Sequence, residues 1–222
     1  MPASEDQSYL ADDVAAGTPV VCVDRAPHRL DVDSVVTTNV TGAAEAVRHL
    51  AAHGHRRIGY LGDRARIRTA AERHRGFSEA LATLRIPFEP ALALQDLPDA
   101  EAAEAATARL FALPDPPTAL FTAQNVLTIG ALRALRRLGL ERTVALVGFD
   151  DFPTADLLTP GITVIAQDPA AMGRLAAELL LARIDGVAGA PATHVVPTTL
   201  VCRGSGELPA PVDRDPGADG LA

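Results

Sequence analysis

Thr143-Val-Ala-Leu-Val-Gly-Phe149 is the stretch that decides the fold, because this continuous apolar run is closed at once by Asp150 and Asp151. Such a run, rich in β-branched residues and ended by polar ones, is typical of a strand buried on both faces. The preceding segment 125–138 has apolar residues at helical spacing and is followed by Gly139, a frequent helix stop. A helix leading into a fully buried strand predicts a parallel sheet covered by helices.

The same alternation of strand and helix patterns extends through most of the chain. Strands are predicted at residues 19–23, 34–38, 57–61, 91–94, 118–122, 162–166 and 193–202, and further helices at about 5–16, 41–53, 69–84, 99–113 and 168–184. Helix starts are marked by Asp99, by Asp168-Pro169 and by the capping-box pattern Thr69-Ala-Ala-Glu72. The fold class is therefore α/β, with parallel strands joined by right-handed crossovers. The tail 206–222, rich in Pro, Gly and Asp, is predicted to be disordered.

Composition excludes several classes of function. All 20 basic residues are arginine, so a P-loop lysine, a Schiff-base lysine and a Ser-x-x-Lys nucleophile are excluded. The 28 acidic residues bring the formal net charge to −8, which argues against this chain gripping nucleic acid by itself. No apolar run reaches the roughly 18 residues of a membrane helix.

The N-terminal residues and the cysteines indicate a cellular compartment. Residues 1–6 show neither the basic nor the apolar region of a secretory signal. Cys22 and Cys202 are far apart, and each stands in a strand-like run, so both are expected to be small reduced core residues. A cytoplasmic location is the expectation that follows.

No constellation for catalysis or metal binding is visible. The chain contains neither a Gly-x-Ser-x-Gly nucleophile elbow nor a Gly-x-Gly-x-x-Gly dinucleotide loop. His49 and His53 stand four residues apart on one predicted helix, a spacing that can hold zinc, but a third ligand is not evident. We therefore predict no catalytic residues, no metal and no cofactor, and a protein that is not an enzyme.

Polar residues that follow the strands are the candidates for ligand binding, because ligands of parallel sheets sit beyond the carboxyl ends of the strands. Asp24 and Asp150 each follow an apolar strand, and could either accept hydrogen bonds from vicinal sugar hydroxyls or cap the next helix. Arg73 lies on the inward stripe of a helix near its start, where it would meet ligand oxygens or a carboxylate. Asn125 is a plausible helix cap, which leaves Gln124 to face the cleft.

Six motifs occur in a fixed order along the chain. They are Thr18-Pro-Val-Val-Cys-Val-Asp24-Arg25, Gly54-His-Arg-Arg-Ile-Gly-Tyr-Leu-Gly62, Arg73-His-Arg-Gly-Phe77, Pro117-Thr-Ala-Leu-Phe-Thr-Ala-Gln-Asn125, Val144-Ala-Leu-Val-Gly-Phe-Asp-Asp151 and Leu200-Val-Cys-Arg-Gly-Ser205. In order and spacing, the region from Thr18 to about Ser205 resembles the effector-binding region of LacI/GalR-type bacterial transcription regulators.

The resemblance implies two Rossmann-like lobes of the periplasmic-binding-protein type I fold, in an effector-binding domain over residues 1–205. The C-terminal lobe is expected at about 40–166 and 192–205, and a partial N-terminal lobe at about 1–39 and 167–191. The chain is expected to cross between the lobes near 38–40, 166–167 and 189–193. Regulators of this type also carry a helix-turn-helix headpiece and the first β/α units of the N-terminal lobe. Neither of these parts matches any stretch of this sequence. The N-terminal lobe is therefore expected to be incomplete.

The resemblance also implies roles for individual residues. The effector would be held by Asp24, Arg73, Asp150 and Gln124, with Phe121 and Thr69 lining the pocket. A homodimer surface would involve the helix at 126–138. Its candidate contact residues are Ile129, Leu132 and Arg133.

The implied function is ligand sensing in a DNA-binding transcriptional regulator of the LacI family. A small effector of the sugar or polyol class would bind between the lobes and change the operator affinity of the parent protein, which would contact DNA only through its headpiece. A periplasmic-type solute-binding protein for a sugar transporter shares this fold and is the alternative. An enzyme on the same scaffold is the third possibility, because fold alone does not prove function.

Overall fold

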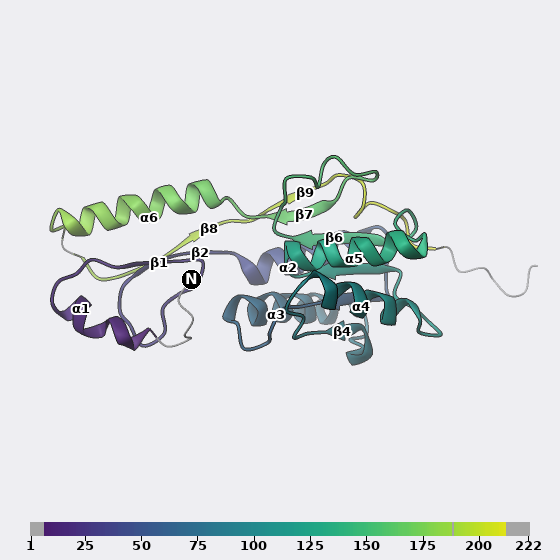
Figure 1. The fold of residues 1–222 in the computed structure, drawn as a ribbon, viewed down its shortest axis with the longest axis horizontal. Helices are drawn as coiled ribbons and strands as arrows, with labels where there is room; N and C mark the ends of the chain where they lie inside the picture. The colour runs from purple at the N-terminus through teal and green to yellow at the C-terminus, as the bar shows by residue number, and fades with distance from the viewer. Residues whose placement is uncertain (1–6, 188, 212–222) are drawn as a thin grey trace, which may run out of the picture.

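The computed structural model describes residues 7–187 and 189–211. Within these residues the strands form one sheet of six strands and one of three, which organise two lobes lying end to end (Figure 1). Neighbouring strands are parallel in both sheets, apart from one antiparallel pair at the edge of the larger sheet. The predicted α/β class with parallel sheets is confirmed.

The strand that the sequence predicts most clearly, β6 (Ala145–Phe149), lies in the interior of the sheet of the larger lobe. This sheet has the order β4-β3-β5-β6-β7-β9 in the described chain. The strands are β3 (Ile58–Leu61), β4 (Ala93–Leu94), β5 (Ala119–Thr122), β6 (Ala145–Phe149), β7 (Thr163–Ala166) and β9 (Thr199–Val201), and the helices are α2 (Asn39–Ala52), α3 (Arg68–Thr83), α4 (Ala100–Phe111) and α5 (Asn125–Leu138), with a short 3₁₀ turn, η2 (Pro90–Leu92). Every residue of β3, β5 and β6 is buried, because helices cover both faces of the sheet.

Alternate residues of the central strands enter two different cores. Tyr60, Phe121 and Val147 face α2 and α3, while Leu120 and Leu146 face α4 and α5. This alternation follows from the two-residue period of a strand. The two helix pairs thus bury both faces of the sheet and leave its strand ends for polar residues.

The smaller lobe is a parallel sheet in the order β1-β2-β8, made of β1 (Val21–Val23), β2 (Asp33–Thr37) and β8 (Thr193–Val196). One long helix, α6 (Pro169–Ile184), contacts β1 and β2, and η1 (Ser8–Leu10) leads into the short α1 (Ala11–Ala15). Figure 1 shows α6 and α1 on opposite sides of this sheet. Among the described residues, no helix combines the length and the apolar character needed to span a membrane.

Within the described residues, the chain passes between the lobes at three places: after β2 at Thr38, after β7 at Gln167, and between β8 and β9 at Pro197-Thr198. The third place differs from the expectation near 189–193. The stretch 193–202 was expected to be one strand of the C-terminal lobe, but β8 pairs with β2 of the smaller sheet and only β9 joins β7. Pro197 has no backbone N–H and cannot continue a ladder, so the strand breaks there.

Helix starts agree with two of the three predicted capping patterns. Asp99 accepts a hydrogen bond from the backbone N–H of Ala102 at 2.8 Å, and Asp168 accepts one from Ala171 at 2.8 Å. The capping box predicted at Thr69 is wrong, because α3 starts one residue earlier and its N-cap side chain makes no capping hydrogen bond in the described structure. The carboxylate of Glu72, which was expected to complete this box, instead accepts hydrogen bonds from Asn39 and Arg68.

Part of the predicted disordered tail is ordered. The backbone N–H of Gly206 donates to the Thr163 hydroxyl at 3.2 Å, and that of Ala210 donates to the His53 carbonyl at 3.1 Å. Leu208 packs against the core under α2 and accepts a hydrogen bond from buried His55 at 2.8 Å. Residues 206–211 therefore belong to the larger lobe, and 212–222 lie outside the described residues.

A buried ion pair holds the smaller lobe together. The Asp33 carboxylate, 4% exposed, accepts a hydrogen bond from Arg183 Nε at 2.7 Å and one from the backbone N–H of Ala192 at 2.9 Å. Arg183 also donates to the carbonyl of Gly189 at 2.7 Å. These bonds connect the end of α6 to β2 and to the segment leading into β8. The hydrogen bond from Arg183 holds the pKa of Asp33 below its ordinary value, against the effect of burial.

This ion pair predicts a specific loss of stability in acid. A carboxyl whose folded pKa is lowered stabilises the fold above its unfolded pKa of about 3.9, and this contribution disappears as the pH falls through the folded pKa. Below about pH 4 the native chain is therefore expected to lose stability more steeply than the variant Asp33→Asn, in thermal melts followed by circular dichroism. The variant Asp185→Asn, at an exposed position in the same lobe, is the control. Parallel acid profiles for the native chain and Asp33→Asn would contradict this.

Candidate ligand-binding site

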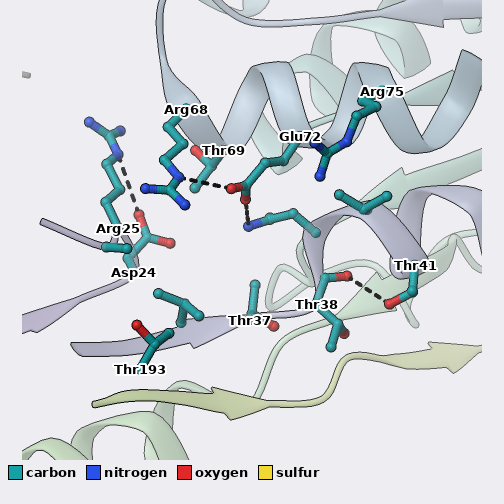
Figure 2. A pocket seen from close by; sticks show the side chains of 14 residues that line it. Asp24, Arg25, Thr37, Thr38, Thr41, Arg68, Thr69, Glu72, Arg75 and Thr193 are labelled. Carbon is teal, nitrogen blue, oxygen red and sulfur yellow. Dashed lines mark hydrogen bonds and ion pairs between the residues drawn. The ribbon is translucent and has the colours of Figure 1, made fainter. Parts of the chain in front are cut away.

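A cavity of about 290 Å³ lies between the smaller sheet and the first turns of α3. Figure 2 shows Asp24 and Arg25 on one side, the side chains of α3 above and threonines of the lobe junction below. Side chains able to form hydrogen bonds predominate in its wall, and they come from both lobes. They are Asp24, Arg25, Thr37, Thr38, Asn39, Thr41, Arg68, Thr69, Glu72, Arg75 and Thr193.

Asp24 and Asp150 occupy equivalent positions in the two lobes. Asp24 follows β1 and Asp150 follows β6, and both have a left-handed backbone, with φ of 74° and 70°. In each case the backbone N–H donates across the strand end, from Asp24 to the carbonyl of Val35 and from Asp150 to that of Ile165, both at 2.9 Å. Aspartate tolerates this left-handed conformation better than most residues, and the turn that it makes ends the strand.

The Asp24 carboxylate is incompletely paired. Its closest described cation is Arg25, whose Nε lies 3.7 Å from the carboxylate. Burial raises the pKa of Asp24, while the positive charges of Arg73 and Arg25 oppose this shift and the negative charge of Asp150 adds to it. The charges of Arg73 and Asp150 thus form part of the electrostatic environment of Asp24, although neither residue belongs to the cavity wall and no described ion pair joins either of them to Asp24.

Arg73 is the buried centre of this environment, with a side chain that is only 7% exposed. Its Nε donates to Asn39 Oδ1 at 2.8 Å, and its Nη1 donates to the Ala123 carbonyl at 2.7 Å and to Asp150 Oδ2 at 3.1 Å. The guanidinium carbon also lies 3.8 Å from the centre of the Phe149 ring. A flat, always charged group with several donors suits such a site, because each contact replaces hydration lost on burial.

Polar contacts continue from Arg73 to Asn39 and Gln167, which lie at two of the three crossings between the lobes. Asn39, one residue after the crossing at Thr38, donates through Nδ2 to Glu72 Oε2 at 3.0 Å. Gln167 donates to the other oxygen of Asp150 at 2.6 Å. The site therefore joins α3, the start of α2 and the start of the α6 connection through one hydrogen-bonded network.

Sequence reasoning missed Asn39 and Glu72 of this network. Asn39 follows the end of β2 by two residues, so a search of the polar residues just after each strand could have identified it. Glu72 was expected to cap α3, but its carboxylate is bonded to Asn39 and to Arg68 Nε, the latter at 3.0 Å.

The remaining predicted site residues are Thr69, Gln124 and Phe121, and they differ in their position relative to the cavity. Thr69 lines the cavity, whereas Gln124 is not part of its wall: it is the partly exposed N-cap of α5, and its side chain accepts no capping hydrogen bond from a described residue. Asn125 is the first residue of that helix rather than its cap. Phe121 was expected to line the pocket and does not: its ring is fully buried in the core, 6.3 Å from the ring centre of Phe77.

The predicted dimer residues lie along one side of α5. Ile129 and Leu132 are half-buried against the core beneath α5, whereas Arg133 is exposed, with its Nη1 3.7 Å from the Glu101 carboxylate of α4. This arrangement leaves a partly apolar strip on α5. The strip remains the predicted dimer surface.

The family model of the periplasmic binding protein-like domain matches residues 47–206. The transcriptional repressor CytR of Escherichia coli K12 is 31% identical over 189 residues, which make up 84% of this chain and 55% of CytR. The chain spans about half the length of the curated relatives that it matches.

Solved structures share the fold. A regulatory protein of the LacI family from Chloroflexus aggregans superposes with a TM-score of 0.83 at 29% identity, over 91% of this chain and 74% of that protein. The complex of the transcriptional regulator CelR with cellobiose gives a TM-score of 0.77 at 32% identity, over 86% of this chain and 59% of CelR. Both similarities extend over the two lobes and the residues between them.

Proposed function

This chain belongs to the periplasmic binding protein-like family, in which it is an effector-binding region of the LacI regulator type, and from this premise we propose that its cavity binds a small polyhydroxy compound of the sugar class. The observation that carries the proposal is the network around Arg73. Arg73 pairs with Asp150, and Asn39, which accepts a hydrogen bond from Arg73, lines the same cavity as Asp24.

The chemistry of the cavity suits hydroxyl groups. A carboxylate such as Asp24 accepts hydrogen bonds from two neighbouring hydroxyls, and each charge-assisted bond contributes about 1.5–3 kcal/mol. The hydroxyls of Thr37, Thr69 and Thr193 can donate or accept around the same cavity. Cationic and anionic side chains alternate in its wall, which favours an uncharged guest with many hydroxyls.

Contacts to both lobes provide a way for the ligand to act at a distance. Asp24 belongs to the smaller lobe, whereas Thr69 and Glu72 belong to the larger one, so a bound ligand bridges them. A ligand that binds one lobe arrangement more tightly shifts the equilibrium toward it, with couplings of about 1–3 kcal/mol being typical. In the parent protein, we expect this shift to change operator binding through a DNA-binding headpiece, within a homodimer joined through α5.

The relatives favour a regulator over a transport protein or an enzyme. CytR and the ribose operon repressor of Haemophilus influenzae, two curated relatives of this chain, are transcriptional repressors, and the solved structure of CelR is a complex with cellobiose. A solute-binding protein for a transporter would use the same cavity. A gel-shift assay on the parent protein with and without ligand distinguishes the two, because only a regulator changes its affinity for DNA.

Calorimetric titration of pentoses, hexoses, disaccharides and sugar acids into the native chain tests the proposed ligand class. We expect the variant Asp24→Asn to bind the best ligand about 10- to 100-fold more weakly, because it loses charge-assisted hydrogen bonds. Its folding stability should not fall, because burial already disfavours the charge of Asp24 and asparagine accepts the left-handed backbone.

The control for this experiment is Asp63→Asn. Asp63 follows β3 in the larger lobe and is partly exposed, but it is not part of the cavity wall. Its substitution should leave the affinity unchanged. Equal affinity in the native chain and in Asp24→Asn would show that the ligand binds elsewhere, and absence of binding throughout the panel would contradict the sugar class.

A further inference from the structure

Three metal-ligating side chains meet on the larger lobe, away from the cavity. His49 is on α2, Cys202 directly follows β9, and Glu207 lies in the ordered segment after β9. The cavity is lined by residues at the start of α2, and His49 is ten positions after Asn39. A helix rises 1.5 Å per residue, so roughly 15 Å of helix separates this cluster from the cavity.

The ligand atoms of the three side chains already lie within coordination range. One donor atom from each of His49, Cys202 and Glu207 is within 4.8 Å of the other two, and His49 Nε2 is 2.5 Å from Glu207 Oε1. In a tetrahedral zinc site, bonds of about 2.0–2.3 Å place neighbouring donor atoms roughly 3.3–3.8 Å apart. Small side-chain rotations therefore suffice to place one ion between the three donors.

The carboxylate is oriented as metal ligands usually are. Glu207 Oε2 accepts hydrogen bonds from the Thr163 hydroxyl at 2.8 Å and from the backbone N–H of Gly204 at 2.5 Å. These bonds hold one oxygen and leave Oε1 facing His49. Partners of this kind fix the direction of a ligand and support metal affinity.

The site is also open to solvent. Cys202 was expected to be a core residue, but its side chain is exposed, and within the described residues it forms no disulfide. A water molecule can therefore reach the ion as a fourth ligand.

We propose that His49, Cys202 and Glu207 form a binding site for a zinc ion. A thiolate, an imidazole and a carboxylate together suit this borderline-soft ion better than the hard ions Ca²⁺ and Mg²⁺, which prefer oxygen ligands. The ion would connect α2 to the segment 202–207, which follows the last strand. It would thus stabilise the larger lobe independently of any ligand in the cavity.

Titration of the 222-residue chain with Zn²⁺, in competition with a chromophoric chelator, tests the proposal. Binding of one ion per chain is expected, with a rise in Tm, because an ion bound only by the folded state stabilises it. Co²⁺ provides a second readout, since a cobalt–thiolate bond gives a charge-transfer band. In Cys202→Ser and His49→Gln the Zn²⁺ affinity should fall at least about tenfold, the loss typical of a disturbed metal site.

Cys22→Ser is the matched control, because it removes the other cysteine, which lies on β1 of the smaller lobe. It should keep the affinity and the cobalt band. The proposal is overturned if the native chain does not bind Zn²⁺ in a one-to-one ratio, or if Cys202→Ser binds it as tightly as the native chain. Both variants expose no new core surface, and a native circular dichroism spectrum in the absence of metal verifies that they fold.

Discussion

The variant Arg73→Ala is expected to lose about 3 kcal/mol of folding stability and all ligand binding. The substitution removes the partner of Asp150 and leaves Asn39 and the Ala123 carbonyl without their donor. Removing one member of a buried ion pair typically costs about 3–5 kcal/mol, and partial exposure of Asp150 to solvent places this site at the lower end. Urea denaturation measures the stability, and calorimetric titration measures the binding.

Two further substitutions separate the role of the charge from that of the geometry. Arg73→Lys retains the charge but has a single nitrogen to serve three acceptors, so its stability and affinity should lie between those of the native chain and Arg73→Ala. Arg75→Ala, on the same helix, removes an exposed arginine that lies 3.8 Å from Glu79, and should cost less than about 1 kcal/mol. Equal losses of folding stability in Arg73→Ala and Arg75→Ala would refute the central role of the buried arginine.

Opposite effects are expected when alanine replaces glycine in two helices. An added Cβ at Gly76, on α3, would collide with the Val40 carbonyl oxygen and lie 3.0 Å from the Cβ of Ala43, both on α2. At Gly173, on α6, nothing lies within 4 Å of the added atom. Overpacking costs about 1–3 kcal/mol, so Gly76→Ala should destabilise the chain by that amount. Gly173→Ala should stabilise it by about 0.5–1 kcal/mol through helix propensity.

The pair is informative because the chemical change is the same in both variants. Differences in the free energy of unfolding therefore report the space around each position. Gly76→Ala should also alter ligand binding, because it separates α2 from α3, and the cavity is lined by residues of both helices. If Gly76→Ala stabilises the chain as Gly173→Ala does, the close packing of α3 against α2 is disproved.

Local periodicity was sufficient to predict the class of fold. The apolar runs at β3, β5 and β6 and the helical spacing between them are local properties, and they alone specify a covered parallel sheet. The change of sheet within 193–202 was not predicted, because β8 and β9 are similar in composition and adjacent along the chain. Pro197 is the sign of the break, but its effect depends on which strands are neighbours.

The candidate site was predicted in part for the same reason. Asp24 and Arg73 could be proposed because a strand end or an inward helix stripe can be recognised locally, whereas Thr69 was proposed from the family resemblance. Phe121 was expected at the pocket from the family resemblance alone, and its own strand could not correct this, because both faces of a fully buried strand are apolar. The distant members of the cluster at His49 are equally hidden from local reasoning, because Glu207 is 158 residues after His49.

The crossings described above also define how the lobes can move. Thr38 and Thr198 belong to two different crossings, and their hydroxyls are hydrogen bonded at 2.8 Å, with the Thr198 N–H donating to Thr38 Oγ1 at 2.9 Å. Because hydrogen bonds join these two crossings side by side, the lobes can bend relative to one another more easily than they can slide or twist. We therefore expect the lobes to rotate relative to one another about an axis through this threonine pair, which would open and close the cavity.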